Sequence, residues 1–149
     1  MISVEEATAR IVAAMPEENR PALAAYGDYF TRFENAPTVL VPLHRSTTAF
    51  SFLVDPSIET SLKQAIERME HESSLISASL ALANLLLMAH TLGLGASAMT
   101  GPLVAEPTLR TLLEVPQGWD LVAVVPLGFP AELPTPTTRK PVDAVIRWR

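Results

Sequence analysis

The chain has 149 residues, of which 48% are hydrophobic and 18% are charged. A chain of this length is long enough to form one hydrophobic core, and its composition is too apolar for a disordered protein. We therefore expect a single domain over residues 1–149. The formal net charge of −5 argues against a nucleic-acid binder, and the lack of cysteine excludes disulfides, zinc–thiolate sites and thiol nucleophiles.

The N-terminal third predicts two helices followed by a strand. Ser3 and Glu6 have the spacing of a capping box, and the apolar residues that follow keep a helical period until Pro16. A second helical pattern runs from Arg20 to Phe33. Thr38–Leu43 is apolar on both faces and predicts a buried strand. The N-terminus lacks the basic and apolar segments of a signal peptide, so we expect a cytoplasmic protein.

The middle of the chain is dominated by helix. After a loop-like segment from His44 to Ser51, Asp55-Pro56 predicts the start of a helix that reaches Met69. The longest helix is expected over Ser73–Leu92, ended by Gly93 and Gly95.

From Ser73 to Ala105 the sequence contains no Asp, Glu, Lys or Arg. The length approaches that of a membrane span, but serines, Asn84 and His90 interrupt the apolar run and no basic flank frames it. We therefore expect no membrane insertion. A helix apolar almost all round belongs in a core or a subunit interface, so we expect a homodimer that uses this helix.

The C-terminal third predicts an extended piece, a turn, a helix, a strand and an arm. These are Ala96–Met99, Thr100-Gly101-Pro102, a helix from Glu106 through Leu113, a strand over Leu121–Gly128, and an arm over residues 130–149. Prolines fix the arm as far as Pro141, and Val142–Arg149 is compatible with either a helical turn or a terminal strand. Two strands among helices predict an α+β fold.

Sequence signatures of side-chain catalysis are missing. His44, His71 and His90 lie on different predicted elements without metal-ligand spacing, so each is interpreted as a solvated or hydrogen-bonded histidine, and no metal site is expected. No residue is predicted to be catalytic, and any chemistry would come from a bound cofactor.

Two segments are candidate binding sites. Arg139 and Lys140 lie beside two threonines in the arm, an arrangement that suits a phosphate monoester, although a solvated charge pair would look the same. The turn at Met99-Thr100-Gly101 is able to aim backbone N–H groups at a flat ring or an anion, and is equally compatible with an ordinary turn.

Several motifs resemble those of the FMN-dependent nitroreductase family. They occur in the family's order from about Arg20 to the C-terminus. They are Asn35-Ala36-Pro37 before the first strand, Asn84 to Gly95, Met99-Thr100-Gly101, Leu109 to Pro116, Val124 to Glu132, Arg139-Lys140-Pro141 and Val145 to Trp148. The resemblance implies a three-layer α+β fold, with a central mixed or antiparallel sheet flanked by helices.

The resemblance also implies a cofactor and a set of contacts to it. FMN would carry hydride from NAD(P)H to an oxidised acceptor, such as a nitro or quinone-like compound. Arg139 matches the family's C-terminal phosphate-binding arginine, with Lys140 beside it. The backbone N–H groups of Thr100 and Gly101, after Met99, match the turn that faces the flavin ring. Ala98 would pack against the ring, and Arg32 would lie near its pyrimidine edge.

One departure from the family pattern concerns the N-terminal arginine-rich segment that grips the FMN phosphate, which this sequence does not contain. We therefore expect an N-terminally truncated form of the fold. Either a homodimer or a second polypeptide that supplies the segment would complete the site. The alternative is a non-catalytic binding or partner subunit that has lost its grip on the flavin.

Overall fold

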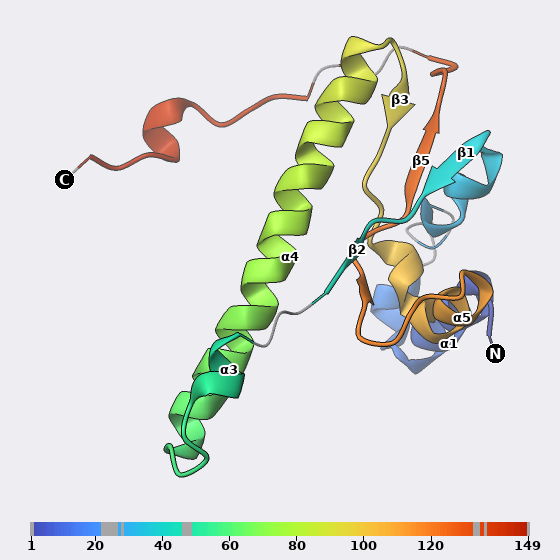
Figure 1. The fold of residues 1–149 in the computed structure, drawn as a ribbon. Coiled ribbons are helices and arrows are strands. Elements are labelled where there is room, and N and C mark those ends of the chain that lie inside the picture. The colour runs from blue at the N-terminus through green and yellow to red at the C-terminus, as the bar shows by residue number, and fades with distance from the viewer. Residues whose placement is uncertain are drawn as a thin grey trace.

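In the computed structural model, two small antiparallel sheets lie along one side of a single long helix, and the C-terminal arm leaves on the other side (Figure 1). The structure describes residues 2–21, 27, 29–45, 49–132, 135 and 137–148. The predicted α+β class is confirmed by this arrangement.

The N-terminal helix α1 spans Val4–Ala14, as the capping pattern predicts. Ser3 is its N-cap, and its hydroxyl oxygen accepts a hydrogen bond from the Glu6 N–H at 3.0 Å. A 3-10 turn, η1 (Glu17–Asn19), follows Pro16. Residues 22–26 and 28 of the second predicted helix lie outside the described residues, and its expected end is instead a 3-10 turn, η2 (Arg32–Asn35).

Both predicted strands are present, but each is divided in two. β1 (Thr38–Leu40) and β2 (Leu43–His44) replace the first strand, and β4 (Asp120–Leu121) and β5 (Val125–Gly128) replace the second. With β3 (Gly95–Ala96) they form a sheet in the order β1-β5-β3 and a ladder of β2 with β4.

The strands divide because their register shifts by one residue. Leu40 pairs with Val125, whereas Leu43 pairs with Leu121, so two residues on one side face three on the other. Pro42 lies at this point and has no N–H to donate, although its carbonyl accepts from the Val122 N–H at 2.9 Å. The shift acts as a bulge that turns the chain from one sheet into the next.

The core forms where the second predicted strand passes beneath the long helix. Val122, Ala123 and Val125 are buried against Leu82, with partly buried residues packed around them: Leu40, Leu75, Ala78, Leu85, Leu86 and Ala96. The apolar character of residues 121–125 is therefore explained by the core. The first strand is less buried than expected, since Val39 is exposed.

The long helix α4 spans Thr60–Thr91 without interruption, so the expectation of two helices on either side of Ser73 is wrong. Residues 70–74 contain no proline or glycine, and Ser74 is accommodated because its hydroxyl donates to the His71 carbonyl at 2.9 Å. The helix ends as predicted at Gly93, whose φ of 74° allows the Leu94 N–H to donate to the Ala89 carbonyl at 2.9 Å.

Before α4, a short helix, α3 (Phe50–Leu53), begins at the end of the segment His44–Ser51 that is expected to be a loop and extends two residues beyond it. Glu70 on α4 holds its first turn, because its carboxylate accepts from the Phe50 N–H at 2.5 Å and the Ser51 hydroxyl at 2.6 Å. A sequence reading could not find this long-range cap, because nineteen residues separate Ser51 from Glu70.

After β3, a 3-10 turn, η3 (Gly101–Ala105), leads into α5 (Glu106–Leu112), close to its predicted position. The Thr108 hydroxyl donates to the Ile2 carbonyl at 2.6 Å and so fastens α5 to the N-terminus. In the arm, Val142–Ala144 forms a 3-10 turn, η4, which decides between the two conformations left open.

One side of α4 is an exposed apolar stripe. It faces away from the core, and its members follow each other at intervals of three or four residues: Leu62, Ala65, Met69, Ser73, Ile76, Leu80, Ala83 and Leu87. We refer to these eight residues as the outer stripe. Ile76, Leu80 and Leu87 are 58%, 64% and 66% exposed.

Among the described residues, α4 is the one helix long and apolar enough to cross a membrane by length and composition. Its most apolar window has a mean hydropathy of 1.5, and 11% of that window is buried. A single helix of this kind is weak evidence for a span, because core and interface helices of soluble proteins share these properties.

Candidate functional site

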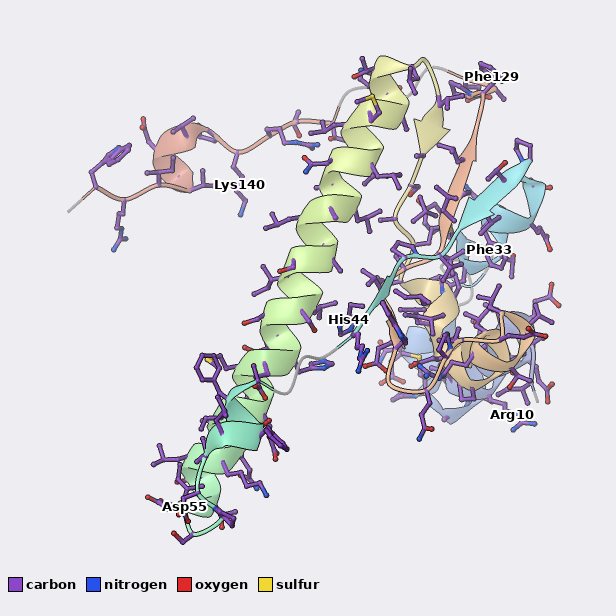
Figure 2. The ribbon with its side chains drawn as sticks, in the orientation of Figure 1. Arg10, Phe33, His44, Asp55, Phe129 and Lys140 are labelled. Carbon is purple, nitrogen blue, oxygen red and sulfur yellow. The ribbon has the colours of Figure 1, made fainter. Side chains whose placement is uncertain are left out.

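An open groove of about 350 Å³ lies at the edge of the sheet where β1 and β3 begin and β5 ends. Arg32 and Asn35 of η2 and Ser97 after β3 are its polar lining residues, and the backbone of Gly95 and Gly128 contributes to its wall. Phe129 forms part of the rim at the end of β5 and is 85% exposed (Figure 2). The groove thus combines a cation, an amide and a hydroxyl with an aromatic edge.

Arg32 has a defined position at this groove. Its guanidinium carbon lies 5.3 Å from the centroid of the Tyr29 ring, which is within cation–π range. This contact holds a positive charge beside Asn35, so both residues offer N–H donors to the same space. The position suits the predicted role of Arg32 at the edge of a heteroaromatic ring.

The predicted turn at Ala98–Gly101 begins directly after Ser97 and so continues from the groove wall. Met99 is buried, and its backbone exchanges two hydrogen bonds with Val124, at 2.9 and 2.8 Å. Its side chain therefore belongs to the core. Ala98 and Thr100 are exposed on either side of it.

Gly101 is explained by packing. A Cβ atom at this position would lie 2.0 Å from Cδ1 of Phe30, so the aromatic ring occupies the space that any larger side chain would need. The glycine thus allows the ring of Phe30 to approach the backbone closely. Whether its N–H faces a ligand stays a prediction.

Arg139 and Lys140 lie far from this turn within one chain. Figures 1 and 2 show the arm that carries Lys140 on the opposite side of α4 from the sheets. Both residues are exposed, and the Arg139 guanidinium donates to the Thr137 hydroxyl. The structure therefore brings Arg32 close to the Ala98–Gly101 segment but does not bring Arg139 and Lys140 to them.

The groove matches part of the expected cofactor. Arg32, Asn35 and Ser97 are suitable donors for the carbonyl-bearing edge of a flat heteroaromatic ring, and Phe129 adds apolar surface beside it. A phosphate monoester carries close to two negative charges and needs charged donors. Those expected for it lie on the arm, so one chain fits the ring of FMN and leaves its phosphate end incomplete.

Sequence reasoning missed one cluster of side chains at the β2–β4 ladder. His44, His71 and Asp120 come from β2, α4 and β4, and one possible ligand atom from each lies within 4.8 Å of the others. Separations of 27 and 49 residues hide this cluster from a motif search. Only the strand register and the helix packing bring the three residues together.

Comparison with known proteins identifies relatives along most of the chain. A family model described as the nitroreductase family matches residues 3–129. The NADH dehydrogenase of Thermus thermophilus is 32% identical over an alignment that covers 94% of this chain and 75% of that protein.

Solved structures of nitroreductase-like proteins share the fold. A protein from Streptococcus mutans superposes with a TM-score of 0.56 at 20% identity, and one from Bacillus cereus with 0.57 at 19%. These alignments cover 75% and 97% of this chain, which spans 62% and 65% of the two proteins. A family protein from Streptococcus pneumoniae gives 0.58 at 17% identity, with 99% and 77% of the chains covered.

Proposed function

Because the chain belongs to the nitroreductase family, a family of oxidoreductases, we propose that it uses FMN to transfer hydride from NAD(P)H to an oxidised acceptor of nitro or quinone type. The observation that carries this proposal is the groove at the strand ends, where Arg32 and Asn35 meet the segment leading to Gly101. The NADH dehydrogenase relative supports a nicotinamide as the reductant. The proposed location is the cytoplasm.

In this proposal the protein side chains bind and orient, and bound FMN supplies the capacity to accept and donate hydride. Arg32 and Asn35 would donate hydrogen bonds to the ring carbonyls, and the positive charge of Arg32 would favour added electron density there. Phe129 would cover the rim and limit access of water. No side chain is required as an acid or base for the hydride transfer itself.

The phosphate end would be completed in a homodimer. The outer stripe of α4 is a run of exposed apolar side chains, a kind of surface that commonly marks an interface, and a second copy of the same stripe would cover it. The arm points away from its own sheets, which supports a role in which Arg139 and Lys140 contact a neighbouring chain (Figure 1). A second polypeptide that supplies an arginine-rich segment is the alternative source of charge.

Flavin titration tests this assignment. Arg139→Ala should weaken FMN binding roughly ten- to a hundredfold, because a charge-assisted contact to phosphate contributes about 1.5–3 kcal/mol. Arg139→Lys should recover part of the loss, since the charge remains without the planar fork. Riboflavin lacks the phosphate and should bind parent and Arg139→Ala equally well, as measured by quenching of flavin fluorescence. Equal FMN affinity in parent and Arg139→Ala would refute the phosphate assignment.

A non-catalytic binding or partner subunit is the second candidate function. The separation of Arg139 and Lys140 from the groove within one chain favours it. The two functions differ in the absorbance spectrum of the purified protein. FMN is added to the protein in excess and free FMN is removed by gel filtration. An oxidised-flavin band that remains with the protein supports the enzyme, and the lack of such a band supports the partner subunit.

A further inference from the structure

Three metal-ligating side chains meet at the junction of α4 with the β2–β4 ladder, away from the groove. They are His44 of β2, His71 of α4 and Asp120 of β4, and their ligand atoms all lie within 4.8 Å of one another. His44 is 5% exposed, so the cluster starts from a buried imidazole and opens towards the surface at His71. Figure 2 shows His44 on β2, the strand that lies next to α4.

The backbone fixes two of the three positions. His44 and Asp120 are directly opposite each other in the antiparallel ladder, so their side chains project from the same face. The third position comes from α4, whose His71 ring meets the His44 ring edge to face, with centroids 5.2 Å apart and planes at 63°. Three elements of regular structure, β2, β4 and α4, therefore hold the cluster.

Hydrogen bonds around Ser74 determine which nitrogen of His44 is available. The Ser74 hydroxyl donates its one hydrogen to the His71 carbonyl at 2.9 Å. With that hydrogen assigned to His71, the 2.8 Å contact with His44 Nδ1 corresponds to the tautomer in which Nδ1–H donates to the hydroxyl oxygen. In neutral His44 the remaining nitrogen, Nε2, consequently carries a lone pair, as metal-binding histidines require.

Asp120 contributes a carboxylate that lies beside the guanidinium of Arg110. Its Oδ1 lies 3.4 Å from Nη1 of Arg110, a long ion pair, and Arg110 also contacts Glu106 at 3.3 Å. The guanidinium is thus shared between two carboxylates. Metal binding requires neutral imidazoles and a carboxylate, so the three ligands would together carry a net charge of −1.

We propose that His44, His71 and Asp120 bind a divalent transition-metal ion, for which zinc is the probe. Two nitrogen donors and one oxygen donor favour zinc-like ions over Mg²⁺ and Ca²⁺, which take oxygen ligands. Ligands around tetrahedral zinc lie about 3.4 Å apart, so side-chain shifts of around 1 Å would close the cluster. A fourth position stays open to water, and the ion would link α4 to the β2–β4 ladder. This proposal departs from the sequence-based expectation that no metal binds.

Calorimetric titration of the untagged full chain, after treatment with EDTA and dialysis, tests the proposal. We expect one Zn²⁺ per chain and no heat from Mg²⁺. His71→Gln should weaken zinc binding at least tenfold, and Ser74→Ala should weaken it roughly ten- to a hundredfold through the loss of the Nδ1 contact. His90→Gln is the matched control, because His90 is also an exposed histidine of α4 but lies outside the cluster.

Two further measurements distinguish zinc binding at this cluster from non-specific zinc binding by surface histidines. Zinc at about 100 times its Kd should raise the Tm of the parent on the order of 5–10 °C, and of His71→Gln by much less. Co²⁺ should give the intense visible bands of a four-coordinate site in the parent. Absence of zinc binding below millimolar concentration, or equal binding by parent and His71→Gln, overturns the proposal.

Discussion

The carboxylate of Glu70 fixes the first turn of α3 against α4. Donors at the start of α3 lower the pKa of Glu70 below its ordinary value of 4.5, first the Ser51 hydroxyl and then the backbone N–H groups. A carboxylate whose pKa is lower in the folded state stabilises the fold above its unfolded pKa. This contribution is lost as the pH falls through the lowered value.

Glu70→Gln should therefore destabilise the protein more at pH 7 than at pH 3. The measurement is the free energy of unfolding in urea at both pH values, for parent and variant. Glu67→Gln is the matched control, since Glu67 is an exposed residue three positions earlier on the same helix. A penalty for Glu70→Gln that is the same at both pH values would contradict the assigned role.

Gly101→Ala should destabilise the protein by about 1–3 kcal/mol, the usual cost of forcing extra atoms into a packed site. The added Cβ would overlap the Phe30 ring, whose Cδ1 lies 2.0 Å from that position. In a Phe30→Leu background the same substitution should cost less, and urea unfolding of all four proteins measures the difference. Thr100→Ala, an exposed neighbour, should have little effect. Equal costs in both backgrounds would place the cause elsewhere.

At the residue scale, local signals predict local structure and fail for contacts between distant elements. The Ser3 cap and the end of α4 at Gly93 follow from a few neighbouring residues, and both are confirmed. The meeting of His44 with His71 depends on strand register and helix packing, which no local pattern encodes. The candidate site could therefore be predicted in pieces, while its assembly required the fold.

At the element scale, the outer stripe of α4 carries the proposed dimer interface. Leu80→Glu should raise the dissociation constant of the dimer more than tenfold, because a carboxylate would be buried without a partner in the middle of the stripe. Sedimentation velocity at micromolar concentration measures the change.

Ser79→Glu provides the control for this prediction. Ser79 is exposed and adjacent in sequence, but it lies to the side of the stripe, where a charge stays in water. Dimer affinity should survive this substitution. A parent protein that sediments as a monomer would remove the basis of both experiments and of the interface itself.

The lengths of the elements were harder to predict than their existence. Apolar runs predicted strands over 38–43 and 121–128. A one-residue shift in their register divides each of them in two. The sequence predicted one helix up to Met69 and another from Ser73, but residues 70–74 contain no proline or glycine, and α4 continues through them. The hydrophobic pattern indicates which residues are buried. Where a strand or helix begins and ends also depends on the elements that pair with it or pack against it.

At the scale of the whole molecule, we expect the arm to contribute to assembly and cofactor binding but not to the folding of the rest of the chain. Every described residue from Ala131 to Trp148 is exposed in the single chain. Removal of residues 131–149 should therefore leave the cooperative unfolding of the sheets and α4 in place while it weakens both dimer formation and FMN binding. Circular dichroism measures the first property, and sedimentation with flavin titration measures the second. Unchanged FMN affinity in the truncated protein would show that the arm does not serve the cofactor.

The charge-free stretch of the chain has a practical consequence for mapping its surfaces. Trypsin has no cleavage site between Arg68 and Arg110, so one peptide beginning at Met69 carries most of α4 and the turn at Gly101. That peptide contains three methionines in different surroundings: Met88 is 58% exposed, Met99 is 5% exposed, and Met69 belongs to the outer stripe at 45%. Under mild peroxide Met88 should oxidise and Met99 should resist, which calibrates the reaction internally. The extent of oxidation at Met69, read by mass spectrometry from the same peptide, then reports whether a second subunit shields α4 in solution.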